Sequence, residues 1–179
     1  MRAILAAVVA AITLTNMEGA MAHDLTLTRT IAASPERVWQ ALTEQDAIAQ
    51  WWGPTGFTAP RVDVDLRPGG RTVVCMTAPG MPLMCNSWIY SEIVPGERLV
   101  FDQGWADAEG AEVDPHTLGF LPADIPLSVP HTISLAAQAD GSTVLSWAEF
   151  GYASAETAAL SQSGLEQVLD KLVRVAEGG

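Results

Sequence analysis

Two segments of the chain place aromatic rings and one carboxyl group at alternate positions, namely WIYSE at residues 88–92 and LSWAE at residues 145–149. Alternate residues of a β-strand point to the same face of a sheet, so each segment would present an apolar wall that contains a single carboxyl group. Burial in such a wall raises the pKa of a carboxyl group and suits it to general acid or base catalysis. The simpler interpretation of Glu92 and Glu149 is a solvated carboxylate near a strand end.

The remaining reactive side chains form no motif for a metal, a phosphate or a nucleophile. The three histidines, His23, His116 and His131, lie too far apart in the sequence for a local metal site. The carboxylates within residues 107–114 lack the spacing of a calcium loop, so we interpret them as a solvated acidic loop. The PGG at residues 68–70 joins two predicted strands, which excludes a phosphate loop, and no nucleophile elbow is present. We therefore expect no cofactor, no metal and no catalytic residue.

The two cysteines of the chain, Cys75 and Cys85, flank a Pro-Gly turn signal at residues 79–80. If this signal is a hairpin turn, the two thiols lie roughly opposite each other on neighbouring strands. We interpret them as buried reduced thiols that act as small apolar side chains, with a disulfide expected only if the protein is exported. Nothing basic stands beside them in the sequence to lower a thiol pKa, so a catalytic or redox role is not expected.

The composition is that of one globular domain. The chain has 179 residues, of which 49% are hydrophobic and 17% are charged, and a domain of this length buries about two-thirds of its unfolded surface. The net charge is -12, and the nine Lys and Arg residues are scattered singly along the chain. Because a phosphate backbone needs clustered cations, nucleic acid is not an expected partner, and neither is an anionic membrane surface.

The first 22 residues allow two interpretations. A single Arg precedes an apolar run at residues 3–14, and the AMA at residues 20–22 fits a signal-peptidase site. The alternative, which the alanine-rich run favours, is that Met21 is the true start. We therefore predict a leader at residues 1–22, a domain at residues 23–179 and a cytoplasmic protein. A periplasmic or secreted protein without stable membrane insertion is the alternative if the leader is cleaved.

The pattern of apolar residues and turn signals predicts a mostly antiparallel sheet. A first strand runs from Asp24 to Ile31, and six further strands are predicted at residues 61–66, 71–77, 83–94, 98–103, 131–137 and 143–150. Ser34 and Thr43 are the predicted N-caps of two short helices after the first strand, the second of which ends at Gly53. Residues 106–130 are rich in proline and are predicted to form a long loop with at most a helical turn.

A long amphipathic helix is predicted to follow Ser154. Its apolar positions recur with a helical period, and they are Leu165, Val168, Leu169, Leu172 and Val175. Such a stripe must be buried against the sheet, so the expected fold class is α+β.

Several segments together resemble a known family. They are LTRTIAASPERVWQALTEQDAIAQWWGPTGF, LRPGGR, SEIVPGERLVF, GSTVLSW and GLEQVLDKL. The chain, from about Leu25 to its end, is similar to the bacterial relatives of the heat-shock-protein ATPase activator within the START or SRPBCC superfamily. The resemblance implies a helix-grip fold, in which a curved antiparallel sheet of six or seven strands wraps around a long C-terminal helix and leaves a cavity between them. Members of this superfamily bind lipids, sterols or polyketides, and some are cyclases or dehydratases. The insert at residues 106–130 departs from the family pattern and would shape the mouth of a cavity.

Trp51 and Trp52 are adjacent in the segment AQWWGPTGF. Neighbouring residues of a helix point about 100° apart, so the two indoles cannot share one contact. We expect one of them to anchor the short helices to the sheet while the other faces the rim of the cavity or the surface.

We interpret the protein as a binder of a hydrophobic or amphipathic small molecule, with ligand-binding candidates drawn from the predicted sheet, short helix and long helix. These candidates are Trp52, Met76, Trp88, Tyr90, Phe101, Trp105, His131, Trp147, Glu149, Leu165 and Leu169. One alternative is a polyketide cyclase or dehydratase that uses Glu149, Glu92, Tyr90 or His131 as acid or base. The other is a protein that interacts with a chaperone, and a homodimer is left open.

Overall fold

A computed structural model describes residues 22–119 and 121–178 of the chain. The two interpretations of the leader fall on residues 1–21, which lie outside the described residues. The described chain folds in the order β1 (His23–Ile31), α1 (Pro35–Thr43), α2 (Gln45–Trp51), β2 (Thr58–Asp63), β3 (Arg71–Thr77), β4 (Met84–Val94), β5 (Arg98–Ala106), the 3-10 turn η1 (Pro115–Thr117), β6 (Ser128–Ala137), β7 (Thr143–Tyr152) and α3 (Ala155–Glu177).

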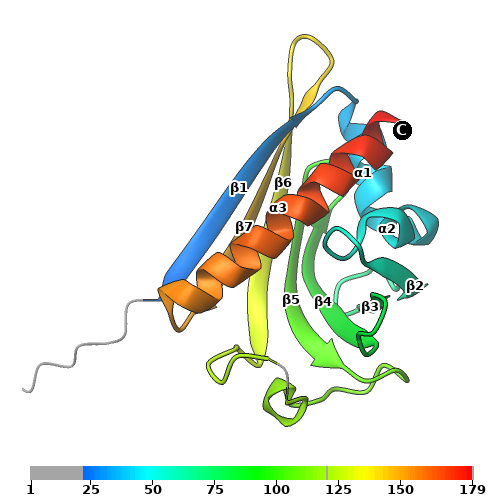
Figure 1. The fold of residues 1–179 in the computed structure, drawn as a ribbon. Helices are drawn as coiled ribbons and strands as arrows, with labels where there is room; N and C mark the ends of the chain where they lie inside the picture. The colour runs from blue at the N-terminus through cyan, green and yellow to red at the C-terminus, as the bar shows by residue number, and fades with distance from the viewer. Residues whose placement is uncertain (1–21, 120, 179) are drawn as a thin grey trace, which may run out of the picture.

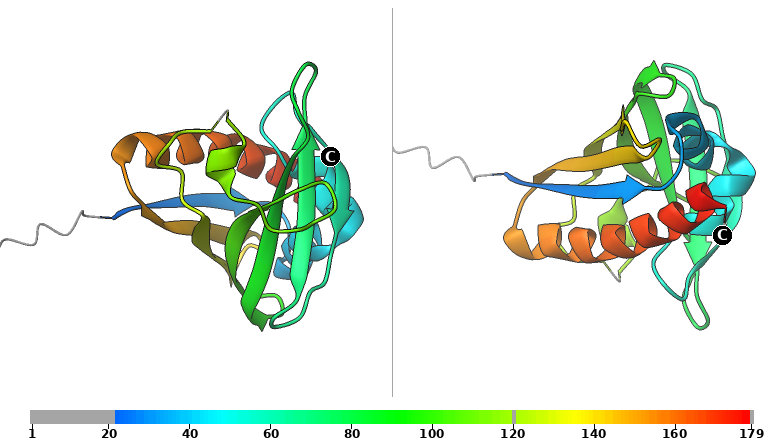
Figure 2. Two further views of the ribbon diagram at one scale, coloured as in Figure 1. Left: turned by 90° about the horizontal axis from the view of Figure 1, so that it is seen from below. Right: turned by 90° about the horizontal axis from the view of Figure 1, so that it is seen from above.

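The seven strands form one antiparallel sheet in the order β1-β7-β6-β5-β4-β3-β2. The sheet curves, and α3 runs across one face of it while α1 and α2 cover the same side near the C-terminal end of α3 (Figures 1 and 2). This arrangement confirms the predicted helix-grip fold.

Local sequence signals explain where the helices begin and end. Ser154 is the N-cap of α3, and its side chain accepts a hydrogen bond from the backbone N–H of Thr157. The helix ends at Gly178, which adopts a left-handed conformation with φ 87° that favours glycine. The predicted cap at Thr43 is wrong by one residue, because Thr43 closes α1 and Glu44 precedes α2.

The second strand lies three residues earlier than predicted, at Thr58–Asp63 rather than 61–66. This strand contains Pro60, which has no N–H to donate to a neighbouring strand. Because β2 is an edge strand of the sheet, the missing N–H of Pro60 is tolerated there.

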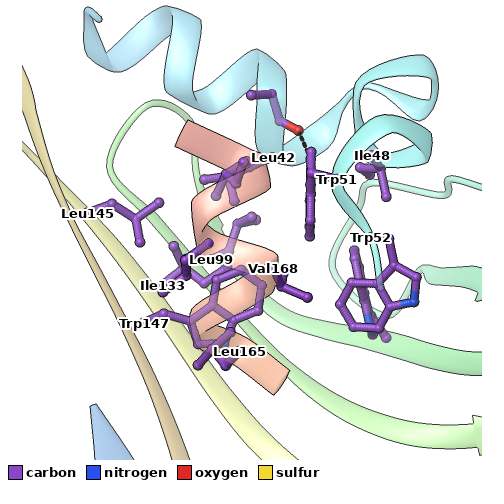
Figure 3. Packing of buried hydrophobic residues seen from close by; sticks show 14 of the residues in the cluster. Leu42, Ile48, Trp51, Trp52, Leu99, Ile133, Leu145, Trp147, Leu165 and Val168 are labelled. Atoms are coloured by element: carbon purple, nitrogen blue, oxygen red, sulfur yellow. Dashed lines mark hydrogen bonds between the residues drawn. The ribbon is translucent and has the colours of Figure 1, made fainter. Parts of the chain in front are cut away.

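The core lies between the sheet and the C-terminal half of α3. Its helical side is the predicted stripe of Leu165, Val168, Leu169 and Leu172, which is buried, whereas Val175 is only half-buried. The sheet contributes Leu99, Ile133, Leu145 and Trp147, as Figure 3 shows for most of this cluster. Burial of each large apolar side chain stabilises the fold by roughly 1.5 to 3 kcal/mol.

The adjacent tryptophans divide their roles as the helical geometry requires. Trp51 is fully buried, and its Nε1–H donates to the carbonyl of Ala41 at 2.7 Å, which ties α2 to α1 (Figure 3). Its ring stacks on Trp88 of β4 with a centroid distance of 6.3 Å. Trp52, in contrast, packs edge-on to Trp88 and lines a pocket between the sheet and α3.

The prediction of reduced thiols is wrong, because Cys75 and Cys85 form a disulfide. The two residues are direct partners in the pairing of β3 with β4, as the turn signal between them indicated. The disulfide belongs to a small cluster with Val73 and Ala106 that is separate from the main core. Val74, which alternates with Val73 and Cys75 along β3, faces the main core instead.

Glu92 does not share a buried face with Trp88 and Tyr90, as the alternation in residues 88–92 had predicted. The pairing of β4 with β5 shifts by one residue between Tyr90 and Glu92, which is the signature of a β-bulge. Glu92 is therefore exposed and lies 3.5 Å from Arg98 in a surface ion pair. It is not an acid or base of an internal site.

The two ends of α3 allow a matched test of the core. Leu172 is fully buried, whereas Leu160 is 56% exposed on the same helix. We expect Leu172→Ala to lower the free energy of unfolding by about 2 to 5 kcal/mol, because it removes buried methyl groups and leaves a cavity. Leu160→Ala should change it by less than about 0.5 kcal/mol. Denaturant unfolding of both variants is the measurement, and equal losses would contradict the location of the core.

Candidate functional site

A pocket of about 370 Å³ lies between the sheet and the N-terminal half of α3. Its lining comes from α3, from β3 to β7, from the turn after α2 and from the loop before β6. The lining residues are Trp52, Gly53, Pro54, Met76, Asn86, Gln103, Trp105, Leu121, Ile125, Val129, His131, Trp147, Glu149, Tyr152, Thr157, Leu160, Ser161, Ser163, Gly164, Leu165, Gln167 and Val168. Most of these side chains are apolar or aromatic, which is typical of small-molecule sites of this size.

The space exists because α3 carries small side chains over this part of the sheet. Ser161, Ser163 and Gly164 line the pocket, in contrast to the leucines of the next two turns. A Cβ atom added to Gly164 would meet no other heavy atom within 4 Å. Glycine in a helix interior costs about 1 kcal/mol relative to alanine. Replacement of Gly164 by alanine would therefore be expected to stabilise the helix.

The predicted long loop between β5 and β6 forms part of the pocket wall. Leu121 and Ile125 of this loop line the pocket. Two hydrogen bonds hold the loop in place: Trp105 Nε1–H donates to the carbonyl of Pro126 at 3.2 Å, and the Ser154 hydroxyl donates to the carboxylate of Asp124 at 2.5 Å. The insert that departs from the family pattern therefore shapes the pocket, and the cap of α3 anchors it.

A buried carboxyl group and two hydroxyl groups form a polar cluster in the apolar wall. The hydroxyl groups of Tyr152 and Ser161 donate to the same carboxyl oxygen of Glu149, Oε2, at 2.5 Å and 2.7 Å. Glu149 is only 3% exposed. Burial raises the pKa of the Glu149 carboxyl group, and the two hydrogen bonds oppose that shift. Burial and the neighbouring Glu149 also raise the pKa of the Tyr152 phenol, which keeps it protonated as a donor.

Tyr152 joins this cluster through an irregularity in β7. The register of β7 against β1 shifts between Glu149 and Tyr152, so that three residues of β7 span two of β1. Gly151 within this bulge has φ 88°, a conformation that other residues rarely adopt. The bulge turns Tyr152 to the same side as Glu149, although regular alternation would place the two on opposite faces.

His131 is neutral and has a fixed tautomer. Its Nδ1 accepts a hydrogen bond from the Nε1–H of Trp147 at 2.8 Å, so the ring proton must be on Nε2. Burial lowers the pKa of the His131 imidazole to about 3. The 3.7 Å approach of Nδ1 to Glu149 Oε1 is therefore not an ion pair. The ring stacks on Phe101 with a centroid distance of 4.9 Å, which holds its plane.

Two buried N–H donors of the lining have no hydrogen-bond partner in the described chain. They are the Nε2–H of His131 and the Nε1–H of Trp52. The other two indoles of the lining do have partners, because Trp105 donates to Pro126 and Trp147 donates to His131. Burial of an unpaired donor costs about 1 to 3 kcal/mol, so this pair is unusual.

Seven of the eleven predicted ligand-binding candidates line the pocket, namely Trp52, Met76, Trp105, His131, Trp147, Glu149 and Leu165. The other four, Trp88, Tyr90, Phe101 and Leu169, are buried in the core beside it. The phenol of Tyr90 is paired with the Thr72 hydroxyl at 2.9 Å rather than with a carboxyl group.

Sequence reasoning missed Tyr152 and Ser161. The signal for Ser161 was a run of small residues at the start of an otherwise leucine-rich helix. The signal for Tyr152 was the Gly-Tyr pair directly after Glu149, where a glycine at a strand end indicates a bulge.

The carboxylates of the predicted acidic loop accept hydrogen bonds from the backbone of the same loop. The carboxylate of Asp107 accepts from the N–H groups of Glu109 and Ala111, and that of Asp114 accepts from the N–H of His116. Within residues 22–119 and 121–178, no group of three or more His, Cys, Asp or Glu residues could hold a metal ion. None of the helices in that part of the chain is both long enough and apolar enough to cross a membrane.

Comparisons with known proteins agree with the fold. The family described as Activator of Hsp90 ATPase homolog 1-like protein matches residues 32–177. A solved structure from Chromobacterium violaceum is 28% identical, with a TM-score of 0.70, and covers 87% of this chain and 98% of its own. One from Mycobacterium smegmatis is 26% identical, with a TM-score of 0.66, over 86% and 88% of the two chains. The AHSA1 protein from Silicibacter pomeroyi, 20% identical with a TM-score of 0.67 over 84% and 95%, shares the fold. No curated protein matches the sequence.

The low pKa of His131 predicts a pH-dependent loss of stability. Between pH about 6.5 and about 3 the unfolded chain binds a proton at His131 that the native protein does not bind. The stability that depends on neutral His131 is therefore complete above pH about 6.5 and falls by about 1.4 kcal/mol per pH unit below it. The raised pKa of Glu149 acts in the opposite sense, so wild type alone would hide the effect.

The difference in unfolding free energy between wild type and His131→Phe separates the two groups, because both proteins retain Glu149. We expect this difference to shrink as the pH falls below about 6.5. Denaturant unfolding across this range is the measurement, and a constant difference would show that the native protein does not lower the pKa of His131.

Proposed function

The chain belongs to the Activator of Hsp90 ATPase homolog 1-like family, and from this premise we propose that it binds an apolar or amphipathic small molecule in the pocket beneath α3. The observation that carries the proposal is the empty space beneath α3, which a larger side chain at Gly164 could fill. The pocket has a volume within the range of small-molecule sites, and Gly164 leaves part of it open. A protein selected for packing alone would gain stability from a larger residue at this position.

A second candidate function is acid–base catalysis in the same pocket. It is favoured by Glu149, whose raised pKa and position in the lining suit a general acid or base. Tyr152 and Ser161 both donate to Oε2 of this carboxyl group, so the other oxygen, Oε1, accepts no hydrogen bond from either residue. A cyclisation or dehydration of the bound molecule would need that oxygen. Chromatography coupled to mass analysis of a bound compound before and after incubation distinguishes turnover from binding, because a cyclisation changes the retention time and a dehydration also removes the mass of water.

A chaperone-related role rests on the family description alone. The exposed large apolar residues of the described chain are distributed over several segments rather than one element. They are Met81, Leu83, Ile89, Leu127, Phe150 and Leu160.

The disulfide supports the exported alternative for location. Disulfides persist in oxidising compartments and are rare in the cytosol of mesophiles, so the Cys75–Cys85 bond fits a periplasmic or secreted protein. We expect the protein purified from its own host to lack free thiols and to begin at His23. Intact-mass analysis with a thiol-alkylating reagent is the measurement. Two alkylated cysteines on a chain that begins at Met21 would restore the cytoplasmic interpretation.

Filling the space at Gly164 is the sharpest test of binding. Gly164→Leu places a leucine side chain in the pocket, and it removes the helix cost of glycine, so the variant should fold at least as well as wild type. We expect it to abolish the change in tryptophan fluorescence that wild type shows on titration with apolar compounds. Gln162→Leu, which adds a leucine to an exposed position of the same helix, should keep that response. Unchanged binding by Gly164→Leu would show that the pocket is not the site.

A further inference from the structure

Two amide side chains lie in the part of the pocket wall that β4 and β5 form. Asn86 of β4 and Gln103 of β5 both line the pocket. In the pairing of these strands Asn86 stands opposite Trp105, and Trp88 stands opposite Gln103. The two amide residues are therefore diagonal neighbours on one face of the sheet, a separation that long side chains can bridge. One polar group of a ligand can lie between them.

A bond to the protein fixes the orientation of each amide. The Nε1–H of Trp88 donates to Gln103 at 3.1 Å, and because an indole nitrogen only donates, the accepting atom must be Oε1. The remaining polar atom of Gln103 is its donor, Nε2. Asn86 is held in the opposite sense, because its Nδ2 donates to the carbonyl of Gly104 at 3.3 Å. The remaining polar atom of Asn86 is therefore an acceptor, Oδ1.

Both of these remaining atoms are accessible. Neither has a hydrogen-bond partner among the described residues. The unpaired side-chain atoms of those residues that are closed off from solvent are Nε1 of Trp52, Nε of Arg71 and Nε2 of His131. Gln103 Nε2 and Asn86 Oδ1 are not among them, so each retains accessible surface. Because Asn86 is only 3% exposed and lines the pocket, the surface that its oxygen retains belongs to the pocket.

A third amide of the lining has a purely structural role and provides a comparison. Both polar atoms of Gln167 are used by the protein, because Oε1 accepts from the N–H of Thr55 at 3.1 Å and Nε2 donates to the carbonyl of Ser163 at 3.0 Å. Asn86 and Gln103 each use only one. An apolar residue of similar size in either place would leave no polar atom to desolvate. The difference points to a ligand that pairs with both amides.

The charges of the lining favour an uncharged ligand. Among its described residues there is no Lys or Arg, and Glu149 is the only acidic one. An anionic group would leave water without a cation to pair with. A cationic group would require Glu149 to ionise, against the direction in which burial moves the pKa of its carboxyl group. An ammonium group also carries donors only, so it would leave Nε2 of Gln103 unpaired.

We propose that the pocket recognises an uncharged polar group that both donates and accepts a hydrogen bond, namely a hydroxyl group or a carboxamide, which accepts from Gln103 Nε2 and donates to Asn86 Oδ1. This inference rests on the proposed function, because it names the class of ligand that the same pocket binds. A ketone, an ester or an ether only accepts, so it would pair with Gln103 and leave Asn86 without a partner. The hydrocarbon part of the ligand lies against the apolar and aromatic side chains of the lining.

A panel of compounds with equal carbon number tests the polar group on the wild-type protein. Octanol and octanamide donate and accept, methyl hexyl ketone only accepts, octane does neither, and octanoic acid and octylamine are charged at neutral pH. Displacement of a polarity-sensitive dye at neutral pH measures each affinity. We expect octanol or octanamide to bind about fivefold more tightly than the ketone, because one further hydrogen bond forms. The tighter of the two identifies the group, and the charged compounds should bind more weakly than the ketone.

Two variants separate the acceptor from the donor. Asn86→Leu removes the acceptor, so the advantage of the alcohol or amide over the ketone should disappear. Gln103→Met removes the donor, so the ketone should lose about fivefold in affinity relative to octane. The matched control is Gln167→Met, which should leave these ratios unchanged because both polar atoms of Gln167 are already paired. Each ratio compares compounds on one variant, so a general change in the packing of the wall cancels.

The outcomes separate this inference from the proposed function. If the ketone binds as tightly as the alcohol and the amide, or if a charged compound binds most tightly, the inference is wrong while the pocket remains a binding site. The inference is also wrong if Asn86→Leu changes the ratios no more than Gln167→Met does. The wild-type panel decides even where a variant fails to fold. If no compound binds wild-type protein that unfolds cooperatively, the proposed function is overturned, and this inference with it.

Discussion

The packing of the C-terminal half of α3 against the curved sheet is the constraint on which the rest of the structure depends. Leu169 and Leu172 are fully buried there. Trp51, which is also fully buried, joins α2 to α1 through its hydrogen bond to the carbonyl of Ala41. Because this half of the helix is held firmly, the other half can extend over the sheet without filling the space beneath it. The pocket is thus a consequence of where the large side chains of one helix stop.

The polar groups of the pocket are arranged at a cost. Glu149 is buried with both hydroxyl donors on one oxygen, and His131 and Trp52 each keep an N–H without a partner. A core built only for stability would replace such groups by apolar ones of similar volume. These groups and the unfilled position at Gly164 line the same pocket, which supports the proposal that a small molecule binds there.

Much of this architecture could be predicted from the sequence, and the failures have local physical causes. Strand periodicity placed Trp147 and Glu149 on one buried face because β7 is regular up to that point. It failed for Glu92 and overlooked Tyr152, because each follows a bulge, and a single inserted residue reverses the face of everything after it. For Cys75 and Cys85 the turn signal placed the two residues opposite each other correctly, and only their oxidation state was predicted wrongly, because it depends on the redox compartment rather than on a local pattern.

We propose that a small apolar molecule enters the pocket beneath α3. Indole N–H resonances in a nitrogen-15 correlation spectrum report this directly, because each tryptophan gives its own signal. On titration with an apolar compound, the signals of the three tryptophans that line the pocket, Trp52, Trp105 and Trp147, should move. The signal of Trp51, which is outside the lining and donates to Ala41, should stay in place. A spectrum in which all three of these signals stay fixed while the compound is in excess would contradict binding in this pocket.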